Sequence, residues 1–534
     1  MRRWNGWGEE SVSYPLPSSA AQFLETALGP GSPPRDATFA SVVGTVPRSR
    51  LPQHDVRVLS DAAPRLLHAR GQSLPDWIAL RTGRVGSLPD GVANPETPAD
   101  VRGLIRFAHD AGAHIIPYGG GTSVVGHISP QPGDAPVLTI DMGRLSRLQE
   151  LDQKSHLAVF GAGVYGPDLE AQLRALGFTL GHFPQSFEFS TLGGWIATRS
   201  SGQQSMGYGR IERLFAGGKL ESPTGPLDLP AFPASAAGPD LREIVLGSEG
   251  RLGVITEATV RVRPLPERED FHALFLPDWE SAQAAAREIA QSAVPLSMLR
   301  ISTPVETRTS LLLAGRPRLI GALERLLAAR GAGEAKCMLL LGLTGRESIV
   351  SAARREVLAM SRHHGGIHVG RAFGRHWQKN RFRAPYLRNS LWEAGYAVDT
   401  LETATSWANV PVIVSSIEAG LAEAIAQCNE KAHIFTHLSH SYPHGSSVYT
   451  TYIFRLAPDP DETLERWRRL KSAASAAIVA CGGTISHQHG VGIDHAPYLH
   501  HEKGVLGMQA LARICSCFDP DGLMNPGKLV GPSA

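Results

Sequence analysis

The chain has 534 residues, of which 42% are hydrophobic, 19% charged and 7% aromatic, and these values exclude a disordered, collagenous or coiled-coil protein. Its 52 Lys and Arg residues nearly balance 50 Asp and Glu residues, so the net charge of +2 provides no field that would attract nucleic acid. The 5 scattered cysteines do not suit a disulfide framework, and neither a signal peptide nor an apolar run of roughly 18 residues is present. We therefore expect a cytoplasmic protein of about two to four domains.

The first half of the chain changes from an irregular to a regular pattern. Residues 1–90 combine Pro-rich patches with short helical stretches near residues 20–28 and 62–67, which indicates a covering segment. Beyond it, Thr97 can cap a helix that ends at Gly112. Strands are predicted over residues 114–118, 137–141, 156–160 and 256–263, a helix over residues 167–176, and a surface loop over residues 225–240.

The second half begins after Pro264 and Pro266. Residues 267–480 alternate apolar strands with Ala-rich helices, which predicts a second α+β domain after a first one over residues 91–266. Its expected strands include residues 274–276, 338–341 and 448–456. Residues 481–534 start with a turn rich in Gly and His and contain a predicted helix over residues 504–517.

Three glycine-rich loops stand out in the first domain. The loop of residues 119–123, GGGTS, follows a predicted strand and would aim successive backbone N–H groups at one point, which suits a pyrophosphate but also an ordinary tight turn. Its spacing matches neither GxGxxG nor GxxxxGK[ST], which disfavours nicotinamide-binding and nucleotide-hydrolase folds. With the loops of residues 190–202 and 247–256, it suits a long ligand whose charge is met by Arg199 or by backbone donors.

Candidate catalytic groups gather near the C-terminal end. Histidines surround Tyr442 and recur in the SHQHGVG turn of residues 486–492, and a general acid or base role is favoured over a metal site. Cys515 and Cys517 would point to different faces of a helix and are poor metal ligands. Arg300 and Arg388 lie in apolar surroundings and need either an internal carboxylate or a bound phosphate, two alternatives that the sequence leaves open.

These motifs carry a family resemblance. PYGGGTSV, GHFPQSFEFSTLGGWIATRSSG, GSEGRLGVIT, SHQHGVG and DPDGLMNPGKL resemble the flavoproteins of the vanillyl-alcohol-oxidase type. WNGWG at residues 4–8, LR at 299–300, YLR at 386–388 and SYPHGSSVY at 441–449 are similar to the alkyldihydroxyacetonephosphate (alkylglycerone-phosphate) synthase family. The resemblance implies an α+β fold with a two-lobed FAD-binding domain over residues 91–266, a cap domain over residues 267–480, and a segment over residues 481–534 that completes the active site.

The resemblance also implies roles for individual residues. Tyr442 matches the active-site tyrosine, Arg388 the substrate-phosphate ligand and Arg300 an arginine needed for activity. His182, His487 and His489 match histidines near the flavin and the substrate. The residues implied to bind FAD are Pro117, Gly119, Gly120, Gly121, Thr122, Ser123, Val124, Pro184, Ser186, Phe189, Ser190, Thr191, Gly194, Thr198, Arg199, Ser200, Ser201, Gly202, Ser248, Glu249, Gly250, Leu252, Gly253, Val254 and Ile255.

The implied reaction is a redox-neutral exchange, in which a fatty alcohol replaces the acyl group of acyl-dihydroxyacetone phosphate to form an ether lipid. FAD is expected to bind non-covalently, because Thr122 and Ser123 stand where covalent relatives have a histidine; His127 is the nearest alternative attachment site. Because the substrates are lipid-like, we expect peripheral contact with a membrane surface without insertion. A homodimer is also compatible with this interpretation.

Two departures from the family pattern keep an alternative open. The family's run of three histidines is His487-Gln488-His489 here, and Ile493-Asp494-His495 replace the basic residues that follow. The tail DPDGLMNPGKLV is closer to FAD-linked dehydrogenases or oxidases of 2-hydroxy acids, and a polyol phosphate is a further substrate class. Those dehydrogenases carry a metal-binding GHxGDGNLH segment, where this chain has HSYPHGSSVY, so we predict no metal site.

Overall fold

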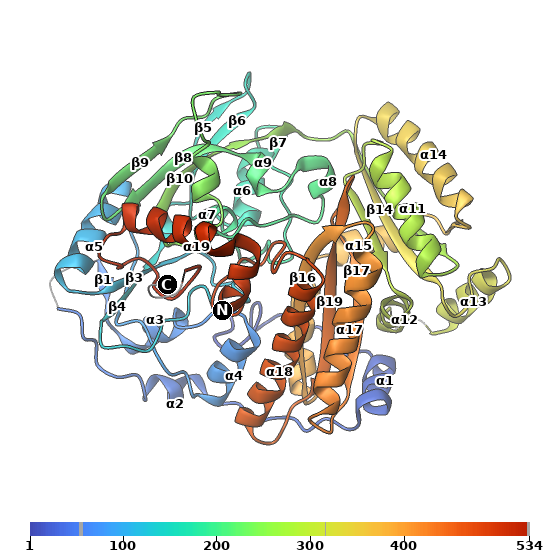
Figure 1. Ribbon diagram of the computed structural model, residues 1–534, viewed down its shortest axis with the longest axis horizontal. Coiled ribbons are helices and arrows are strands. Elements are labelled where there is room, and N and C mark those ends of the chain that lie inside the picture. Colours follow the sequence, from blue (N-terminus) through green and yellow to red (C-terminus); the bar gives the residue numbers. More distant parts are fainter. Residues whose placement is uncertain (53–56, 315–316, 531–534) are drawn as a thin grey trace.

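The computed structural model describes residues 1–52, 57–314 and 317–530 (Figure 1). Its N-terminal part has a small hydrophobic cluster of its own, in which Val42, Leu66 and Leu80 are buried. The elements are α1 (Ser18–Leu28), α2 (Phe39–Val43), β1 (Val58–Leu59), α3 (Ala62–Leu67), α4 (Leu74–Thr82) and β2 (Gly91–Ala93). The helices expected near residues 20–28 and 62–67 are therefore present as α1 and α3.

The first sheet has the strand order β1-β2-β4-β3. Strands β3 (His114–Tyr118) and β4 (Val137–Asp141) have the predicted bounds and pair in parallel. Helix α5 (Pro98–Asp110) starts with a capping box, in which Thr97 accepts from the N–H of Asp100 and the Asp100 carboxylate accepts from the N–H of Thr97. Its buried face packs against this sheet, and β3 ends where the glycine loop starts.

The second sheet is antiparallel and has the order β5-β6-β10-β8-β9. Its strands are β5 (Leu148–Asp152), β6 (Leu157–Gly161), β8 (Phe215–Ser222), β9 (Gly225–Leu229) and β10 (Val254–Arg261). The elements around it are α6 (Gly166–Arg174), β7 (Phe178–Thr179), α7 (Leu192–Ala197), α8 (Ser205–Tyr208), α9 (Ile211–Leu214), α10 (Arg242–Val245) and β11 (Arg263–Pro264). The prediction of a loop over residues 225–240 is wrong for β9, because a tight turn at Pro223 and Thr224 pairs β9 with β8.

An eight-stranded antiparallel sheet dominates the second half of the chain, in the order β15-β12-β14-β13-β17-β19-β16 with β18 on β19. Its strands are β12 (Arg268–Leu276), β13 (Met298–Ser302), β14 (Cys337–Gly345), β15 (Ile367–His368), β16 (Tyr396–Ser406), β17 (Ala432–Leu438), β18 (Ser441–Tyr442) and β19 (Gly445–Arg455). The helices are α11 (Trp279–Gln291), α12 (Pro304–Leu313), α13 (Pro317–Ala328), α14 (Glu347–His363), α15 (Ala372–Asn380), α16 (Leu387–Glu393), α17 (Val410–Ala426) and α18 (Pro460–Ala480). In Figure 1, α17 and α18 lie side by side along the sheet.

The C-terminal segment returns from this sheet to the first one. Helix α19 (Leu499–Phe518) is longer than predicted, because it merges two helices across a kink at Gly504, which has a φ of 64°. Beyond it, Met524 forms a parallel bridge with Ile115 of β3. Asn525 then donates to the carbonyl oxygens of His127 and Glu249, at 3.1 Å and 2.7 Å. The last residues thereby join two of the glycine-rich loops.

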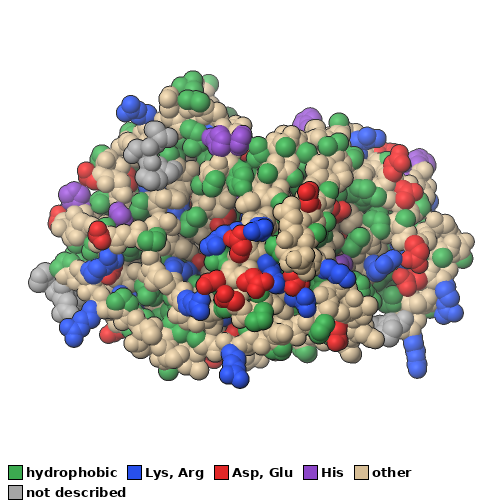
Figure 2. All heavy atoms as spheres, turned by 60° about the horizontal axis from the view of Figure 1, so that its bottom comes forward, with side chains coloured by type: hydrophobic (Ala, Val, Ile, Leu, Met, Phe, Trp, Pro, Cys, Tyr) green, Lys and Arg blue, Asp and Glu red, His purple; other side chains and the backbone are tan. Residues whose placement is uncertain are grey.

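The surface carries charges of both signs. On the face shown in Figure 2, acidic and basic side chains are interspersed. Helix α18 contributes ion pairs of this kind, such as Arg469 with Glu465 at 3.0 Å. Within the described residues, every helix is too short or too polar to cross a membrane.

Candidate active site

A cavity of about 850 Å³ separates the glycine-rich loops from the eight-stranded sheet. This volume lies toward the upper end of the range of roughly 300–1,000 Å³ that is common for ligand sites. One wall comes from residues within the stretches 117–128, 184–203 and 248–255. The opposite wall comes from β13, β14, β16, β17 and β19 and from α1, α12, α15 and α16. The cavity therefore brings together segments from the whole chain.

The glycine loop presents a row of free donors to this cavity. Among the described residues, no group accepts a hydrogen bond from the backbone N–H of Gly120, Gly121, Thr122 or Ser123. Such a row of unpaired N–H groups suits the oxygens of a pyrophosphate. A side chain at Gly120 would also collide with the backbone of Phe189, so the glycines permit close packing of two loops as well as ligand approach.

The other two loops supply hydroxyl groups at the same wall. Thr191 caps α7 by accepting from the N–H of Gly194, and Ser190 Oγ accepts from Trp195 Nε1 at 2.7 Å. Most of the residues predicted to bind FAD line the cavity. Those that do so are Pro117, Gly119, Gly120, Gly121, Thr122, Ser123, Val124, Pro184, Ser186, Ser190, Thr191, Gly194, Thr198, Ser200, Ser201, Ser248, Glu249, Gly250, Gly253, Val254 and Ile255.

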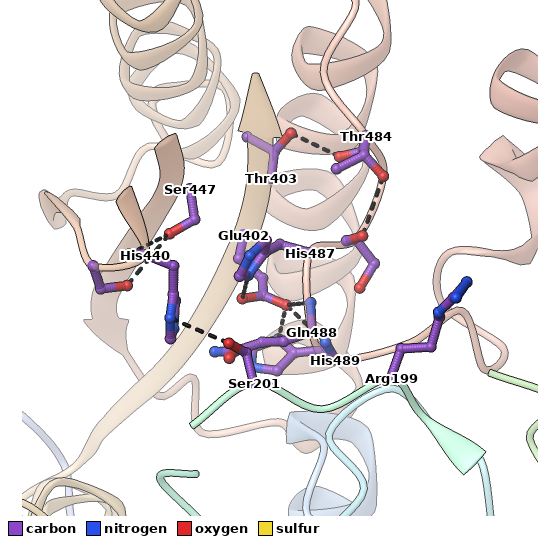
Figure 3. Close-up of polar contacts among 12 residues, drawn as sticks. Arg199, Ser201, Glu402, Thr403, His440, Ser447, Thr484, His487, Gln488 and His489 are labelled. Carbon is purple, nitrogen blue, oxygen red and sulfur yellow. Dashed lines mark hydrogen bonds and ion pairs between the residues drawn. The ribbon is translucent and has the colours of Figure 1, made fainter. Parts of the chain in front are cut away.

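Four residues of that prediction lie outside the cavity lining. Phe189 packs edge-on against Trp7, and Leu252 belongs to the hydrophobic core. Gly202 fits closely against the backbone of Phe183. The Arg199 side chain points away from the histidine turn in Figure 3 and pairs with Glu243. Of the two donors considered for the ligand's charge, the structure therefore favours the backbone N–H groups over Arg199.

Arg300 has an internal carboxylate partner. Its guanidinium pairs with Glu306 of α12, and its Nη2 lies 3.2 Å from His437 Nδ1. Burial raises the pKa of Glu306, but His437 and Arg300 outweigh this effect and bring the pKa to about 2. All three side chains line the cavity. The charge of Arg300 is thus largely neutralised within the protein.

Arg388, unlike Arg300, has no carboxylate partner within ion-pair distance among the described residues. It lies over the ring of Trp77 at 4.4 Å and donates from Nη1 to the carbonyl oxygen of Gln72. Its Nη2 is buried and has no hydrogen-bond partner among the described residues. Burial lowers the pKa of this guanidinium, yet it stays far above neutrality because an arginine does not lose its proton in a protein. A charged, unpaired donor that lines a cavity points to an anionic ligand.

The SHQHGVG turn divides its side chains between two sides (Figure 3). Gln488 and His489 line the cavity, whereas His487 is buried behind it. The backbone N–H groups of Gln488 and His489 both donate to Glu402 Oε1 of β16, at 2.6 Å and 2.7 Å. Glu402 is only 1% exposed. This carboxylate was not predicted, because the mixed polar and apolar sequence of β16, YAVDTLETATS, gives no sign that Glu402 is buried.

Tyr442 and His487 form a second cluster next to that turn. Tyr442 Oη lies 2.6 Å from His487 Nε2, and Arg210 Nη1 donates to the same nitrogen at 2.7 Å. Burial raises the pKa of Tyr442, and Arg210 opposes this shift. Neither Tyr442 nor His487 belongs to the cavity lining that the described residues form. His440 lies between this cluster and the cavity, with its ring 4.9 Å from that of His487.

The cavity wall instead contains Tyr449, on β19. Its ring stacks on His437 at 4.8 Å and meets His489 edge-on at 5.9 Å. Burial raises the pKa of this phenol to about 12, so Tyr449 is neutral and can donate a proton. The alternation of β19 could have revealed it, since every second residue of the strand faces the same side. In the alignment of HSYPHGSSVY with GHxGDGNLH, Tyr449 stands in place of the last histidine.

His182 and His127 lie next to the glycine-rich loops. His182 is buried on Trp195 and lies 3.2 Å from Ser200 Oγ, and burial lowers its pKa to about 3. It lies outside the cavity lining formed by the described residues and acts there as a neutral ring. His127 lines the cavity, with Nδ1 2.9 Å from Ser123 Oγ and Nε2 3.2 Å from Glu249. Both of its ring nitrogens therefore face neighbouring side chains.

One end of the cavity is apolar. Its side chains come from α1, α12, α15 and the eight-stranded sheet, and include Phe23, Leu24, Leu311, Leu312, Met338, Leu340, Phe373, Trp377, Phe435 and Ile453. This end suits an aliphatic chain. Among the described residues, no group of three or more His, Cys, Asp or Glu side chains is arranged to hold a metal ion.

Comparison with known proteins agrees with this geometry. The model of the FAD binding domain family matches residues 89–227, and that of the C-terminal domain of FAD linked oxidases matches residues 265–529. An alkyldihydroxyacetonephosphate synthase from Dictyostelium discoideum is 31% identical, over 99% of this chain and 93% of that protein.

Solved structures extend the similarity to the fold. An alkyldihydroxyacetonephosphate synthase superposes with a TM-score of 0.84 at 28% identity, covering 99% of both chains. The structure of p-cresol methylhydroxylase has a TM-score of 0.65 at 14% identity over 96% of each chain, and therefore shares the fold. These matches confirm the predicted α+β fold with an FAD-binding domain and a cap domain. The chain belongs to the alkyldihydroxyacetonephosphate synthase family of FAD-dependent enzymes.

Proposed function

We propose that the protein exchanges the acyl group of acyl-dihydroxyacetone phosphate for a long-chain fatty alcohol and so forms the ether bond of an ether lipid. The bond between the substrate carbon and the fatty-acid oxygen breaks, and the alcohol oxygen forms a bond to the same carbon. The alcohol proton leaves with the fatty acid, so that no electrons are transferred overall. Bound FAD supplies the reactive flavin ring for this exchange.

The main support for this reaction is that one cavity combines three binding features. Free backbone donors of the glycine loop suit the cofactor pyrophosphate. The unpaired Nη2 of Arg388 suits the substrate phosphate, because guanidinium and phosphate form charge-assisted hydrogen bonds. The apolar end suits the alkyl and acyl chains, each buried methylene contributing about 0.8 kcal/mol. A small hydroxy acid would use only the first two features.

We propose that side chains in the cavity wall transfer the proton. His489 is neutral at physiological pH, since burial lowers its pKa, and it is available to accept the alcohol proton. Tyr449 Oη is available as a donor to an oxygen of the substrate. We propose that Tyr442, which the family resemblance marks, acts one layer back by holding His487 and Arg210 in place. Arg300, paired with Glu306 and in contact with His437, holds these side chains in the same wall.

The lipid-like substrates need a route into the cavity. The apolar end of the cavity is bordered by α1 and α12, and Val305 of α12 is 44% exposed. We propose that this side approaches a membrane surface without insertion, so that the substrate chains pass directly from lipid into the cavity.

An anaerobic assay tests the reaction. Purified yellow protein is mixed with palmitoyl-dihydroxyacetone phosphate and hexadecanol, with mass spectrometry for the products and absorbance for the flavin. Ether product and free palmitate without lasting flavin reduction support the exchange. If no ether forms, and D-lactate, glycolate or glycerol 3-phosphate bleaches the flavin, the protein is instead an FAD-linked dehydrogenase of such a substrate.

A further inference from the structure

Glu402 is a buried carboxylate whose neighbours are the two histidines of the SHQHGVG turn. It extends from β16 toward that turn (Figure 3). His487 Nδ1 lies 3.7 Å from Glu402 Oε2, and His489 Nδ1 lies 3.6 Å from Glu402 Oε1. The described part of the chain gives Glu402 no Lys or Arg within 4.0 Å. The two imidazoles are therefore its nearest ionisable partners.

The contacts of His487 Nε2 determine which ring nitrogen carries the proton. Arg210 Nη1, which can only donate, lies 2.7 Å from His487 Nε2, so this nitrogen must accept. The proton of the neutral ring is then on Nδ1, the nitrogen that faces Glu402. Tyr442 Oη also lies next to Nε2, at 2.6 Å. Tyr442 and His487 are therefore in hydrogen-bond contact, and Glu402 faces the other side of the His487 ring at the longer ion-pair distance of 3.7 Å.

The hydrogen bonds that Glu402 accepts from the turn do not require a negative charge. A glutamine could accept both backbone N–H groups of the turn without placing a charge in the interior. Burial raises the pKa of Glu402, but His489, His487 and the Gln488 N–H together hold it well below its ordinary value, so the group is ionised. The interaction is mutual, so this buried negative charge stabilises either imidazole once that ring gains a proton.

We propose that Glu402 is the positioning residue of this site, which orients both histidines and stabilises the imidazolium of His489 when that ring takes the alcohol proton. The role of His489 rests on the proposed function, whereas the orientation of the rings does not. In the exchange, the proton passes from the alcohol oxygen to His489 Nε2 and then leaves with the fatty acid. Glu402 itself stays ionised throughout.

Glu402→Gln is the direct test, because the amide keeps an acceptor for both backbone N–H groups and removes only the charge. We expect unchanged FAD content, a KM for palmitoyl-dihydroxyacetone phosphate near that of the wild type, and a kcat at least about 100-fold lower. Glu418→Gln is the matched control: Glu418 is partly buried in the second half of the chain and accepts from Thr436 Oγ1 at 2.6 Å. A Glu402→Gln protein with the wild-type kcat would overturn the proposal.

A second measurement needs neither the Glu402→Gln variant nor a substrate. In the wild-type holoenzyme labelled with [15N]histidine, NMR shifts report the tautomer of each ring, and His487→Gln assigns the His487 signals. We expect the proton on Nδ1, the nitrogen facing Glu402; a proton on Nε2 would refute the arrangement. If this tautomer is found but the wild type forms no ether, the proposed function fails while the orientation by Glu402 stands.

Discussion

The side chain of Asn389 hydrogen-bonds the backbone of Trp7 on both sides: Oδ1 accepts from the Trp7 N–H at 3.2 Å, and Nδ2 donates to the Trp7 carbonyl at 2.9 Å. Residue 389 directly follows Arg388 on α16. Near the same N-terminal end of the chain, Arg2 donates to the carbonyl oxygen of Gly120 in the glycine loop at 2.6 Å. Residues 2–7 therefore connect the glycine loop to the helix that carries Arg388.

Asn389→Ala should loosen this connection. It leaves a buried N–H and carbonyl of Trp7 unpaired, which lowers the free energy of unfolding by about 2 to 4 kcal/mol. The KM for the phosphate substrate should also rise, because Arg388 loses its support. Thermal unfolding and steady-state kinetics measure both effects. Asn409→Ala removes two hydrogen bonds elsewhere in the cap and should leave that KM unchanged; equal KM values in both variants would contradict the coupling.

Arg388→Ala should weaken substrate binding rather than cofactor binding. Loss of a buried charge-assisted contact to phosphate predicts a KM about 100-fold higher, with unchanged flavin content. Arg381→Ala is the control, because Arg381 is buried on Phe183 and donates to Gln204 Oε1 within the protein. Steady-state kinetics with palmitoyl-dihydroxyacetone phosphate decide the matter, and a larger KM effect in the control would argue against a phosphate at Arg388.

The two tyrosines should differ in their effect on the reaction. Tyr449→Phe removes a hydroxyl group in the cavity wall and should lower kcat by about 100-fold. Tyr442→Phe, which acts through His487, should lower kcat by about 10-fold or less. Both proteins should contain a full complement of FAD, as absorbance shows. A Tyr442→Phe protein that is more impaired than Tyr449→Phe would move the proton donor to Tyr442.

Asp494 predicts a pH dependence of stability. Its Oδ2 is buried without a hydrogen-bond partner among the described residues, and burial raises its pKa from 3.8 to about 7. The folded protein therefore binds this proton more tightly than the unfolded chain, so stability falls as the pH rises from about 4 to about 7. Asp494→Asn should raise the free energy of unfolding by about 2 kcal/mol at pH 8 and by little at pH 4.

Thermal unfolding of the two proteins at both pH values measures this difference. The prediction fails if the Asp494→Asn protein is no more stable than the wild type at pH 8, or if the gain is the same at pH 4.

FAD should leave the protein on denaturation. The Thr122 and Ser123 side chains offer no attachment to the flavin ring, and both nitrogens of His127 face protein groups. Acid precipitation should therefore give a colourless pellet and a yellow supernatant. A pellet that keeps the flavin absorbance would show a covalent bond, and mass spectrometry of its peptides would then locate the attached residue.

Local sequence patterns were sufficient for many elements. The capping residues Thr97 and Asp100 define the start of α5, and the apolar runs of β3 and β4 have the predicted bounds, because caps and buried strands depend on neighbours in the sequence. The glycine loop at residues 119–121 was recognisable for a similar reason, since the backbone of Phe189 leaves no room for a Cβ atom at Gly120. Strand β9 was missed because its pairing with β8 outweighs its Pro-rich composition.

The sequence by itself determined the family, the cofactor class and the segments that surround the cavity, because these depend on motifs of adjacent residues. Only the tertiary structure decided which polar groups meet. It paired Arg300 with Glu306 and left Arg388 unpaired, although both arginines have apolar neighbours in the sequence. It also set Glu402 against residues 487–489, more than eighty positions along the chain. Such contacts depend on how strands and loops pack across the cavity, and no local pattern encodes them.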